Sequence, residues 1–264
     1  MPFIEIEKSE KQEPWSNSKM HCHTHYELYF LLEGARHFFL DTSLFTLDGC
    51  VLLIIPPFTM HKTEGGNFSR VNVNVEPSYL NPYESEVLQK SACKSILIPN
   101  EHIAVIKNQL DELRDCYGGA RNPYLLRTLF GYLIYYVDKY CGAGVLPGKI
   151  TFGKTADSFV IKIMEYLNDA YGEKITLDHL SELFYMSKIS LHKRFVRATG
   201  ITVMNYLLNL RLVKANQLLT TTSKTIEEIS SATGFSSANY FGLIFKSKTG
   251  VSPMQYRKKQ QEKT

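Results

Sequence analysis

The fold of the last third of this chain is decided by a stretch that occurs twice: Leu180-Ser-Glu-Leu-Phe-Tyr-Met186-Ser187 and Ile229-Ser-Ser-Ala-Thr-Gly234-Phe235-Ser236. An aromatic residue, a glycine and a tyrosine follow each copy, and these anchors are Phe195, Gly200 and Tyr206 in the first and Phe245, Gly250 and Tyr256 in the second. The copies begin 49 residues apart and the later anchors lie 50 apart. The sequence therefore predicts an internal repeat with one inserted residue.

Each copy has the same local pattern, which is a short apolar-periodic helix, a brief break, a serine placed to cap, and a second helix that ends at glycine. In the first copy these helices are expected at about 177–184 and 188–199, and the second copy at about 225–249. Two helices joined by such a turn form a helix-turn-helix, whose second helix can lie in the major groove of DNA.

One set of residues in and before the second copy is specific: Arg211-x3-Ala215-x2-Leu218-Leu219, Ile226-x2-Ile229-x4-Gly234-Phe235, and Tyr240-Phe241-x3-Phe245-Lys246-x3-Gly250-x2-Pro253-x2-Tyr256-Arg257. It resembles the signature of the AraC/XylS family of bacterial transcription regulators. The resemblance implies an AraC-type DNA-binding domain over residues 156–264, double-stranded promoter DNA and RNA polymerase as partners, a homodimer, and an activator. It implies no catalytic role and no cofactor.

Charge divides the 264 residues into two parts. The first 150 residues hold 14 Lys and Arg against 17 Asp and Glu, whereas the rest hold 16 against 9. A net charge of −3 thus precedes one of +7, which favours a nucleic-acid module joined to a part that does not touch nucleic acid. A solvated basic surface is the alternative. The length and the 44% apolar content suit two packed domains.

The five cysteines, Cys22, Cys50, Cys93, Cys116 and Cys141, are odd in number and lack CxxC spacing. They are typical of reduced intracellular thiols. The first 20 residues lack the apolar core of a signal peptide, and no stretch approaches the roughly 20 apolar residues that span a bilayer. We therefore expect a cytoplasmic protein.

The N-terminal part contains short β-rich segments, predicted at 26–32, 37–40, 44–47, 50–55 and 71–75, with regular turn signals such as Glu33-Gly34 and Glu64-Gly65-Gly66-Asn67 between them. This pattern predicts a sandwich or barrel. His21-x-His23-x3-Glu27-x6-Gly34 and Gly49-x6-Pro56-x4-His61 resemble the two cupin motifs, although Phe58 stands where a glycine is usual. The expected fold is two-domain α+β, with a cupin-like barrel and a helical pair followed by an all-α domain.

The barrel mouth allows three interpretations. His21, His23, Glu27 and His61 form a set suited to Fe, Mn, Zn or Ni. An organic effector pocket is the second, with His23, Glu27, Tyr29, Arg36 and His61 as its residues, because regulators of this family commonly keep this frame without metal. Tyr29, Phe38, Phe45 and Phe58, with Arg36 as a charged hook, suit a sugar or an apolar carboxylate. Purely structural residues are the third.

Residues 100–141 are expected to form the helical pair, and residues 1–141 the first domain. Asn100 can cap the first helix, whose apolar seam is Ile103, Ile106, Leu110, Leu113 and Tyr117. Asn122 with Pro123 begins the second. The narrow seam makes the first helix the better candidate for an intersubunit coil, while packing of both helices on the barrel is the alternative. Residues 142–155 are predicted to be a linker.

In the C-terminal domain, Asp157 can cap a helix that Gly172 stops. The helix over 188–199 is expected to present the DNA contacts Ser187, Ile189, His192, Lys193 and Arg197. Lys193 can bond guanine, His192 can donate to a base or phosphate, and Ile189 can touch a thymine methyl. Arg197 suits a phosphate. A merely solvated helix face is the alternative at each position.

A connector helix over 203–219 would be about 26 Å long and hold two reading helices roughly one DNA turn apart. Its Arg211 can reach a phosphate or an internal carboxylate, and the internal bond is favoured. In the second copy, Thr225-x-x-Glu228 is a capping box, Gly234 supplies the turn, and Ser236 is expected to begin the reading helix.

The contacts predicted on this second reading helix are Ser237, Ala238, Asn239, Leu243 and Lys246. Asn239 can read adenine bidentately, whereas Gly242 and Leu243 suggest recognition of DNA by shape and by apolar contacts. The first motif is thus expected to supply most base specificity.

The function predicted from the sequence is a sequence-specific DNA-binding regulator that responds to a small effector in the barrel. A cupin metal-dependent enzyme fused to a DNA-binding module is one alternative. A ligand-independent regulator with a purely dimerising barrel is the other.

Overall fold

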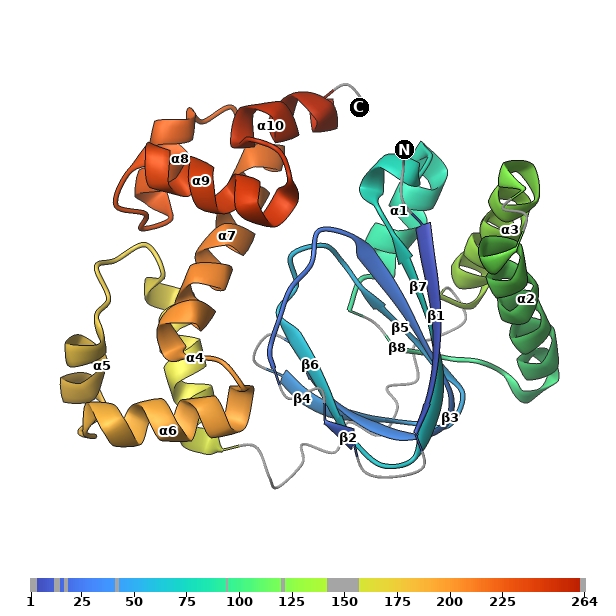
Figure 1. The fold of residues 1–264 in the computed structure, drawn as a ribbon, viewed down its shortest axis with the longest axis horizontal. Helices are drawn as coiled ribbons and strands as arrows, with labels where there is room; N and C mark the ends of the chain where they lie inside the picture. Colours follow the sequence, from blue (N-terminus) through green and yellow to red (C-terminus); the bar gives the residue numbers. More distant parts are fainter. Residues whose placement is uncertain are drawn as a thin grey trace. The chain divides into compact units, whose positions relative to one another are not determined.

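The computed structural model describes residues 4–11, 15–16, 19–40, 43–93, 95–119, 122–141 and 157–261 (Figure 1). The linker predicted at 142–155 lies outside these residues. Contacts group the chain into two compact units, one built mainly from residues up to 141 and the other mainly from 157–261. No helix among the described residues has the length and apolar character needed to cross a membrane.

The first unit is an antiparallel sheet with helices on one face. Its elements are β1 (Ile4–Lys11), β2 (Trp15–Ser16), β3 (Tyr26–Leu40), β4 (Ser43–Asp48), β5 (Val51–Ile55), β6 (His61–Gly65), β7 (Phe68–Val75), the 3-10 turn η1 (Pro77–Tyr79), α1 (Pro82–Lys90), β8 (Ser95–Leu97), α2 (Asn100–Gly118) and α3 (Pro123–Cys141). The main path runs β1-β7-β3-β5-β8, with β4 and β6 also paired to β3. The sheet curves so strongly that it closes most of a barrel (Figure 1).

β3 corrects one prediction. The sequence suggested two strands with a turn at Glu33-Gly34, but a single strand runs from Tyr26 to Leu40. The pairing of β3 with β7 shifts register between Leu31 and Glu33, and Gly34 has a φ of 84°. The glycine therefore serves a β-bulge, which bends a strand without ending it. This one long strand pairs with β4, β5, β6 and β7 and organises the curvature.

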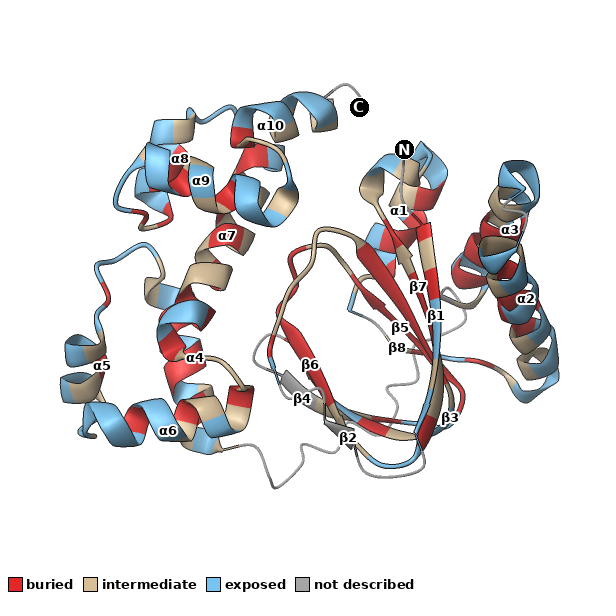
Figure 2. Ribbon diagram, in the orientation of Figure 1, coloured by how far each residue is buried: buried red, intermediate tan, exposed pale blue. Residues whose placement is uncertain are grey.

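The alternation of β3 separates two apolar layers. Tyr26, Leu28 and Phe30 face outward and join a core with α2 and α3, whereas Tyr29 and Leu31 join a second core inside the curved sheet. Figure 2 shows the same division, with buried residues along the strands and exposed residues on the outer sides of the helices. Strands β1, β2, β6 and β8 and helix α1 were not predicted. β1 does alternate apolar and polar residues at Ile4-Glu5-Ile6-Glu7, whereas β2, β6 and β8 are too short to show a clear period.

Two expectations for the helical pair are wrong. Asn100 is the first residue of α2 and not its cap, since Pro99 precedes the helix without a side-chain bond. The apolar seam of α2 is buried in the chain's own core, where Ile106, Leu110 and Leu113 are at most 3% exposed. That seam is therefore occupied within one chain, so the intersubunit coil expected from it is not available. Asn122 does start α3, because its side chain accepts from the backbone N–H groups of Tyr124 and Leu125.

The second unit is all helical. Its elements are α4 (Ser158–Ala170), α5 (Leu177–Leu183), α6 (Lys188–Thr199), α7 (Val203–Thr221), α8 (Ile226–Ala232), α9 (Ala238–Thr249) and α10 (Pro253–Gln261). Asp157 caps α4 as predicted, by accepting from the N–H of Phe159. Helices α5 and α6 form the first motif and α8 and α9 the second, and α7 runs between them (Figure 1).

The internal repeat is exact enough to locate the inserted residue. Tyr185 and Gly234, 49 residues apart, both adopt positive φ in the turns between the paired helices. Ser187 and Ser237, 50 residues apart, both cap the second helix of their motif. Met186 and Phe235, 49 residues apart, each donate a backbone N–H to the carbonyl oxygen of the serine five residues earlier, so the insertion is Ser236. The expectation that Ser236 begins the second reading helix is wrong, because Ser237 caps it and Ala238 is its first residue.

Candidate nucleic-acid interface

The first motif holds its reading helix through capping and a buried aromatic. Thr176 caps α5 and Ser187 caps α6, each by accepting from the N–H three residues later. Leu191 and Phe195 of α6 are fully buried, and the Phe195 ring lies edge-on to Tyr206 of α7 with centroids 5.6 Å apart. At its end, Gly200 adopts a φ of 76°, a common helix stop. Because Leu191 and Phe195 set which face of α6 is buried, they also set which residues of α6 face the solvent.

The outward face of α6 carries the residues predicted for it. Ser187, His192, Lys193 and Arg197 are exposed, and Ile189 is 69% exposed. Lys188 is also exposed, but it forms an ion pair with Asp178 of α5. The predicted contacts therefore lie on one solvent-facing helix surface with three cationic or ionisable side chains.

The second motif repeats this framework with a different outward face. Phe241 and Phe245 are fully buried beside Ile229, Phe235 and Leu219. Outside, Ser237, Asn239, Leu243 and Lys246 are exposed, and Ala238 is half-buried. Leu243 is 70% exposed. This face offers one amide and one ammonium group, so it has fewer hydrogen-bond donors than α6.

Arg211 of helix α7 has partners that differ from those expected from the sequence. Arg211 Nε donates to the carbonyl oxygen of Tyr171 at 2.8 Å, and Nη2 donates to that of Glu173 at 2.7 Å. Its partners are thus two backbone carbonyls just after α4 and not a carboxylate. The bond is internal, as favoured, and burial lowers the pKa of Arg211 below its ordinary value.

A second arginine with a structural role was not predicted. Arg194 Nε and Nη2 donate to the two carboxylate oxygens of Asp157 at 2.5 and 2.7 Å, and its guanidinium lies over the Phe159 ring. The hydrogen bond from Arg194 lowers the pKa of Asp157. Arg194 therefore anchors α6 to the start of α4. Sequence spacing gives no signal for such a pair, because its partners lie 37 residues apart.

The candidate effector residues lie on the inner surface of the curved sheet. Tyr29 and Arg36 are fully buried, and Glu27 is 7% exposed. Arg36 donates to the carbonyl oxygen of Gly65 at 2.5 Å and to the Thr63 hydroxyl at 2.8 Å, and Glu27 accepts from Asn72 at 2.5 Å. Burial raises the pKa of Tyr29 despite the nearby Arg70 and Arg36. Arg36 is thus hydrogen-bonded to the barrel wall. The sequence had suggested instead that its charged group would be available to bind an effector.

Imidazole and carboxylate groups converge as the cupin-like motifs suggested. Ring nitrogens of His23 and His61 and a carboxylate oxygen of Glu27 lie within 4.8 Å of one another. The His21 ring is 4.3 Å from that of His61, centroid to centroid. Phe58 has a φ of 61°, so it adopts the left-handed backbone of the glycine it replaces. The donor set suits a divalent transition metal, and its residues equally suit hydrogen bonding within the barrel.

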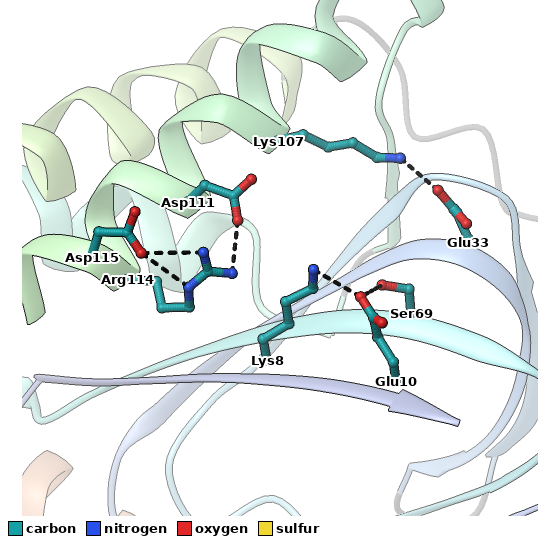
Figure 3. Close-up of polar contacts among 8 residues, drawn as sticks. All are labelled: Lys8, Glu10, Glu33, Ser69, Lys107, Asp111, Arg114 and Asp115. Atoms are coloured by element: carbon teal, nitrogen blue, oxygen red, sulfur yellow. Dashed lines mark hydrogen bonds and ion pairs between the residues drawn. The ribbon is translucent and has the colours of Figure 1, made fainter. Parts of the chain in front are cut away.

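A charged groove outside the sheet was not predicted from the sequence. It has a volume of about 710 Å³ and lies between the end of β1, the bulge in the middle of β3, the start of β7 and helix α2. Figure 3 shows its ion pairs, in which Lys8 bonds Glu10 at 2.7 Å and Lys107 bonds Glu33 at 2.8 Å. Arg114 bridges Asp111 and Asp115 along α2. Most charges in the groove are mutually paired, so the surface is polar but close to neutral.

Comparison with known proteins gives one family match, within the second unit, and relatives that match part or most of the chain. The family described as "Helix-turn-helix domain" matches residues 180–259. The bifunctional transcriptional activator/DNA repair enzyme AdaA of Bacillus subtilis (strain 168) is 36% identical over 110 residues, which are 41% of this chain and 52% of that protein. The chain thus spans about half the length of AdaA. The uncharacterized HTH-type transcriptional regulator YdiP of Escherichia coli (strain K12) is 26% identical over 245 residues, 88% of this chain and 78% of that protein.

Among solved structures, ToxT from Vibrio cholerae O395 is 16% identical and covers 97% of this chain and 96% of its own, with a TM-score of 0.39. The matched family region coincides with the doubled motif, and the curated relatives are named as transcription regulators. Over residues 180–259, the chain therefore matches the AraC-type helix-turn-helix domain of transcription regulators.

Proposed function

We propose that this protein regulates transcription by binding a specific double-stranded DNA sequence through α6 and α9. The observation that carries the proposal is the duplicated framework, in which each second helix buries its aromatics and exposes the opposite face. An exposed, capped helix with cationic side chains fits the major groove, and its charges add phosphate attraction. The net charge of +7 after residue 150 supports the same reading.

In this proposal, α6 and α9 contribute unequally to recognition of the DNA sequence. Lys193 and His192 of α6 supply hydrogen bonds to base edges, while Arg197 near the helix end holds a phosphate. On α9, Asn239 is the one exposed side chain suited to a bidentate base contact, and Leu243 contributes an apolar touch to thymine. Most base specificity therefore comes from α6, and α9 contributes mainly shape, methyl contacts and anchoring by Lys246.

Binding sites selected from random DNA test this division. Lys193→Ala and Asn239→Ala are compared by their affinities for the selected site and for random DNA. We expect the specificity ratio to fall about 5- to 100-fold for Lys193→Ala, the range for one good base contact, and less for Asn239→Ala. Lys162→Ala, an exposed cation on α4, is the control and should leave the ratio unchanged. A larger loss from Asn239→Ala would reverse the assignment.

The inner surface of the first unit is the proposed effector site. Glu27, Tyr29 and Arg36 are polar groups within an otherwise apolar layer, an arrangement typical of pockets for small organic molecules. A thermal-shift screen with sugars, fatty acids and amino acids tests it, because a ligand at 100 times its Kd adds about 2.7 kcal/mol of stability. Tyr29→Phe and Arg36→Gln should weaken any hit, whereas Lys8→Gln in the outer groove should not. The opposite pattern would assign the effector to the groove.

A homodimer that contacts RNA polymerase completes the proposal. The α2 seam is used internally, so the exposed side of α3 supports the dimer better, since Tyr124 is 85% exposed and Leu125, Tyr132 and Tyr135 are also exposed. Sedimentation of the full chain should give a dimer, and Tyr135→Arg should shift it to monomer. Transcription in vitro from the selected site, with and without effector, decides whether regulation is positive.

A metal-dependent activity is the second candidate, and the convergence of His23, Glu27 and His61 is the observation that favours it. Protein purified without chelator is assayed for bound transition metal. Stoichiometric metal that is lost in His61→Ala would support this candidate, whereas an effector pocket predicts substoichiometric metal in both proteins.

A further inference from the structure

The midpoint of α7 separates two packing regions. Its first half packs on the first motif, where Tyr206 touches Phe195. Its second half packs on the second motif, where Leu212, Ala215 and Leu219 share a core with Phe241 and Phe245. Arg211 lies at the boundary of these halves. A single helix thus joins the two motifs, and a lone helix can bend.

A second connection between the motifs is made by Arg211 itself. Its guanidinium reaches the carbonyl oxygens of Tyr171 and Glu173, which follow α4 on the side of the first motif. On its other side lies the turn of the second motif. A Cβ at Gly234 would be 2.9 Å from Arg211 Cζ and 2.7 Å from the Tyr171 carbonyl oxygen. The turn between α8 and α9 therefore lies directly against the guanidinium and the α4 end.

The same junction is close-packed at a second point. A Cβ at Gly172 would be 2.9 Å from the carbonyl oxygen of Ala232, at the end of α8. Residues of the segment after α4, of α7 and of the second motif also line one groove of about 620 Å³, including Lys174, Arg211, Ser231 and Tyr240. The junction is thus a three-way contact of the α4 end, α7 and the α8–α9 turn.

We infer that Arg211 is a positioning residue that holds α6 and α9 at a fixed separation and rotation, and so sets the spacing between the two DNA segments they read. The inference rests on the proposed function and specifies how it is achieved. Arginine suits this role because its planar fork carries several donors in fixed directions, whereas lysine is a point charge on a flexible stem. Arg211 need not touch DNA to control which sites are bound.

Spacing is the readout that separates positioning from general stability. In the selected DNA site, one base pair is inserted or deleted between the segments read by α6 and α9, which rotates and displaces one segment relative to the other. For the wild-type chain we expect affinity to fall by about tenfold, the loss of one motif's base contact. For Arg211→Met and Arg211→Lys we expect weaker binding to the original site but less than about a threefold further loss on insertion.

Arg257 offers a matched control. Its Nε donates to the carbonyl oxygen of Leu219 at 3.2 Å, so it makes the same type of bond within the second motif's side alone. Arg257→Met should weaken binding through lost stability yet keep the full spacing penalty. If Arg211→Met and Arg211→Lys keep that penalty too, Arg211 is not a positioning residue. If selection yields no preferred DNA at all, the proposed function fails instead.

A measurement without DNA tests the inference independently. Spin labels carried on non-natural amino acids at His192 and Ser247 report the separation of α6 and α9 in the full chain. We expect one narrow distance distribution in the wild type and in Arg257→Met, and a broader one in Arg211→Met or in the milder Arg211→Lys. Equal widths in all four proteins would overturn the inference, whatever the DNA experiment gives.

Discussion

The two helix-turn-helix motifs share a core and differ on their surfaces. Phe195 and Phe245 occupy the same buried position, and Thr199 and Thr249 each donate to the carbonyl four residues earlier and contact the chain two residues later in the same way. Outside, α6 presents His192, Lys193 and Arg197, where α9 presents Gly242, Leu243 and Ser247. A buried core must keep one packing arrangement, whereas the side chains of an exposed face can change without disturbing that packing. The two copies therefore share their cores and differ on their outer faces.

The turns differ in a second way. Tyr185 and Gly234 have φ values of 51° and 75° and equivalent places between the paired helices. Tyr185 is 97% exposed, whereas Gly234 lies against the α4 end and Arg211. Only the second turn is part of the junction between the motifs. The equivalent position therefore tolerates a large side chain in one copy and excludes a methyl group in the other.

Truncation of the shared buried phenylalanine should have the largest effect on stability, and the effect should be similar in the two motifs. Phe195→Ala and Phe245→Ala each leave a cavity in a fully buried site, and we expect a loss of about 3–5 kcal/mol of unfolding free energy from either. Hydrogen exchange on the full chain, resolved by helix, measures it. Tyr240→Ala, which removes a half-exposed ring of α9, is the milder control. A loss confined to one copy would show that the cores are not equivalent.

Gly234→Ala should have the next largest effect on stability. It should also distinguish the turn of the second motif from the equivalent turn of the first. The added methyl would meet backbone at 2.7 Å in a left-handed conformation, so we expect a loss of about 2–3 kcal/mol. The matched change at the equivalent turn, Tyr185→Ala, keeps a left-handed alanine but meets open solvent. Protection in α8 and α9 should fall for Gly234→Ala and stay near wild type for Tyr185→Ala. Equal effects would mean that the junction is looser than its contacts indicate.

The sequence predicted the framework of these motifs better than their junction. Periodicity, serine and threonine caps and glycine stops are local signals, and they gave α4, α6 and the capping box of α8 close to their observed bounds. The partners of Arg211 and Arg194 lie 37 to 40 residues away, and no local pattern encodes such contacts. The inserted Ser236 was also misplaced, because Ser236 and Ser237 are equally good caps when seen as sequence alone.

The barrel shows the same limit. Alternation gave the central strands, but Gly34 signals a turn and a bulge equally, and here long-range pairing with β7 selected the bulge. For the candidate site, the predicted reading residues are exposed apart from the half-buried Ala238, while their contacts with DNA stay a prediction. Arg36 is the residue whose surroundings differ most from expectation, since its bonds to Gly65 and Thr63 depend on how β6 lies against β3.

Tyr185→Gly should give a smaller effect of the opposite sign. A non-glycine residue in left-handed backbone costs about 1–2 kcal/mol, while glycine makes the unfolded chain more flexible by roughly 0.5–1 kcal/mol. The exposed ring leaves no packing to lose, so we expect a net gain of about 0.5 kcal/mol in local stability of α5 and α6. Tyr185→Phe keeps the backbone restriction and should change nothing. A clear loss in Tyr185→Gly would mean that the ring makes a stabilising contact in solution.

The smallest predicted effect is a pH-dependent difference in local stability between α5 and α8, the first helices of the two motifs. Thr225 and Glu228 form a capping box on α8, whereas His179 takes the place of the glutamate on α5. The bonds to Thr225 hold the pKa of Glu228 below its ordinary value, with backbone bonding as the first cause and Lys224 adding to it. Because the folded pKa is depressed, the stabilisation is complete above the unfolded pKa and is lost as pH falls through the lower, folded pKa.

Hydrogen exchange between pH 6 and pH 3, corrected for intrinsic rates, should therefore show α8 opening about twofold more at the acid end, the scale of one exposed charge near a helix start. Glu228→Gln keeps the hydrogen-bonding shape without the titration, so α8 should become less sensitive to pH in this range, with Glu227 as the remaining carboxylate of its first turn. The comparison is made on α8 itself, because α5 also carries a carboxylate, Asp178, in its first turn. If α5 and α8 lose protection together in the wild type and in Glu228→Gln, acid acts on the whole domain and the capping box does not distinguish the two motifs.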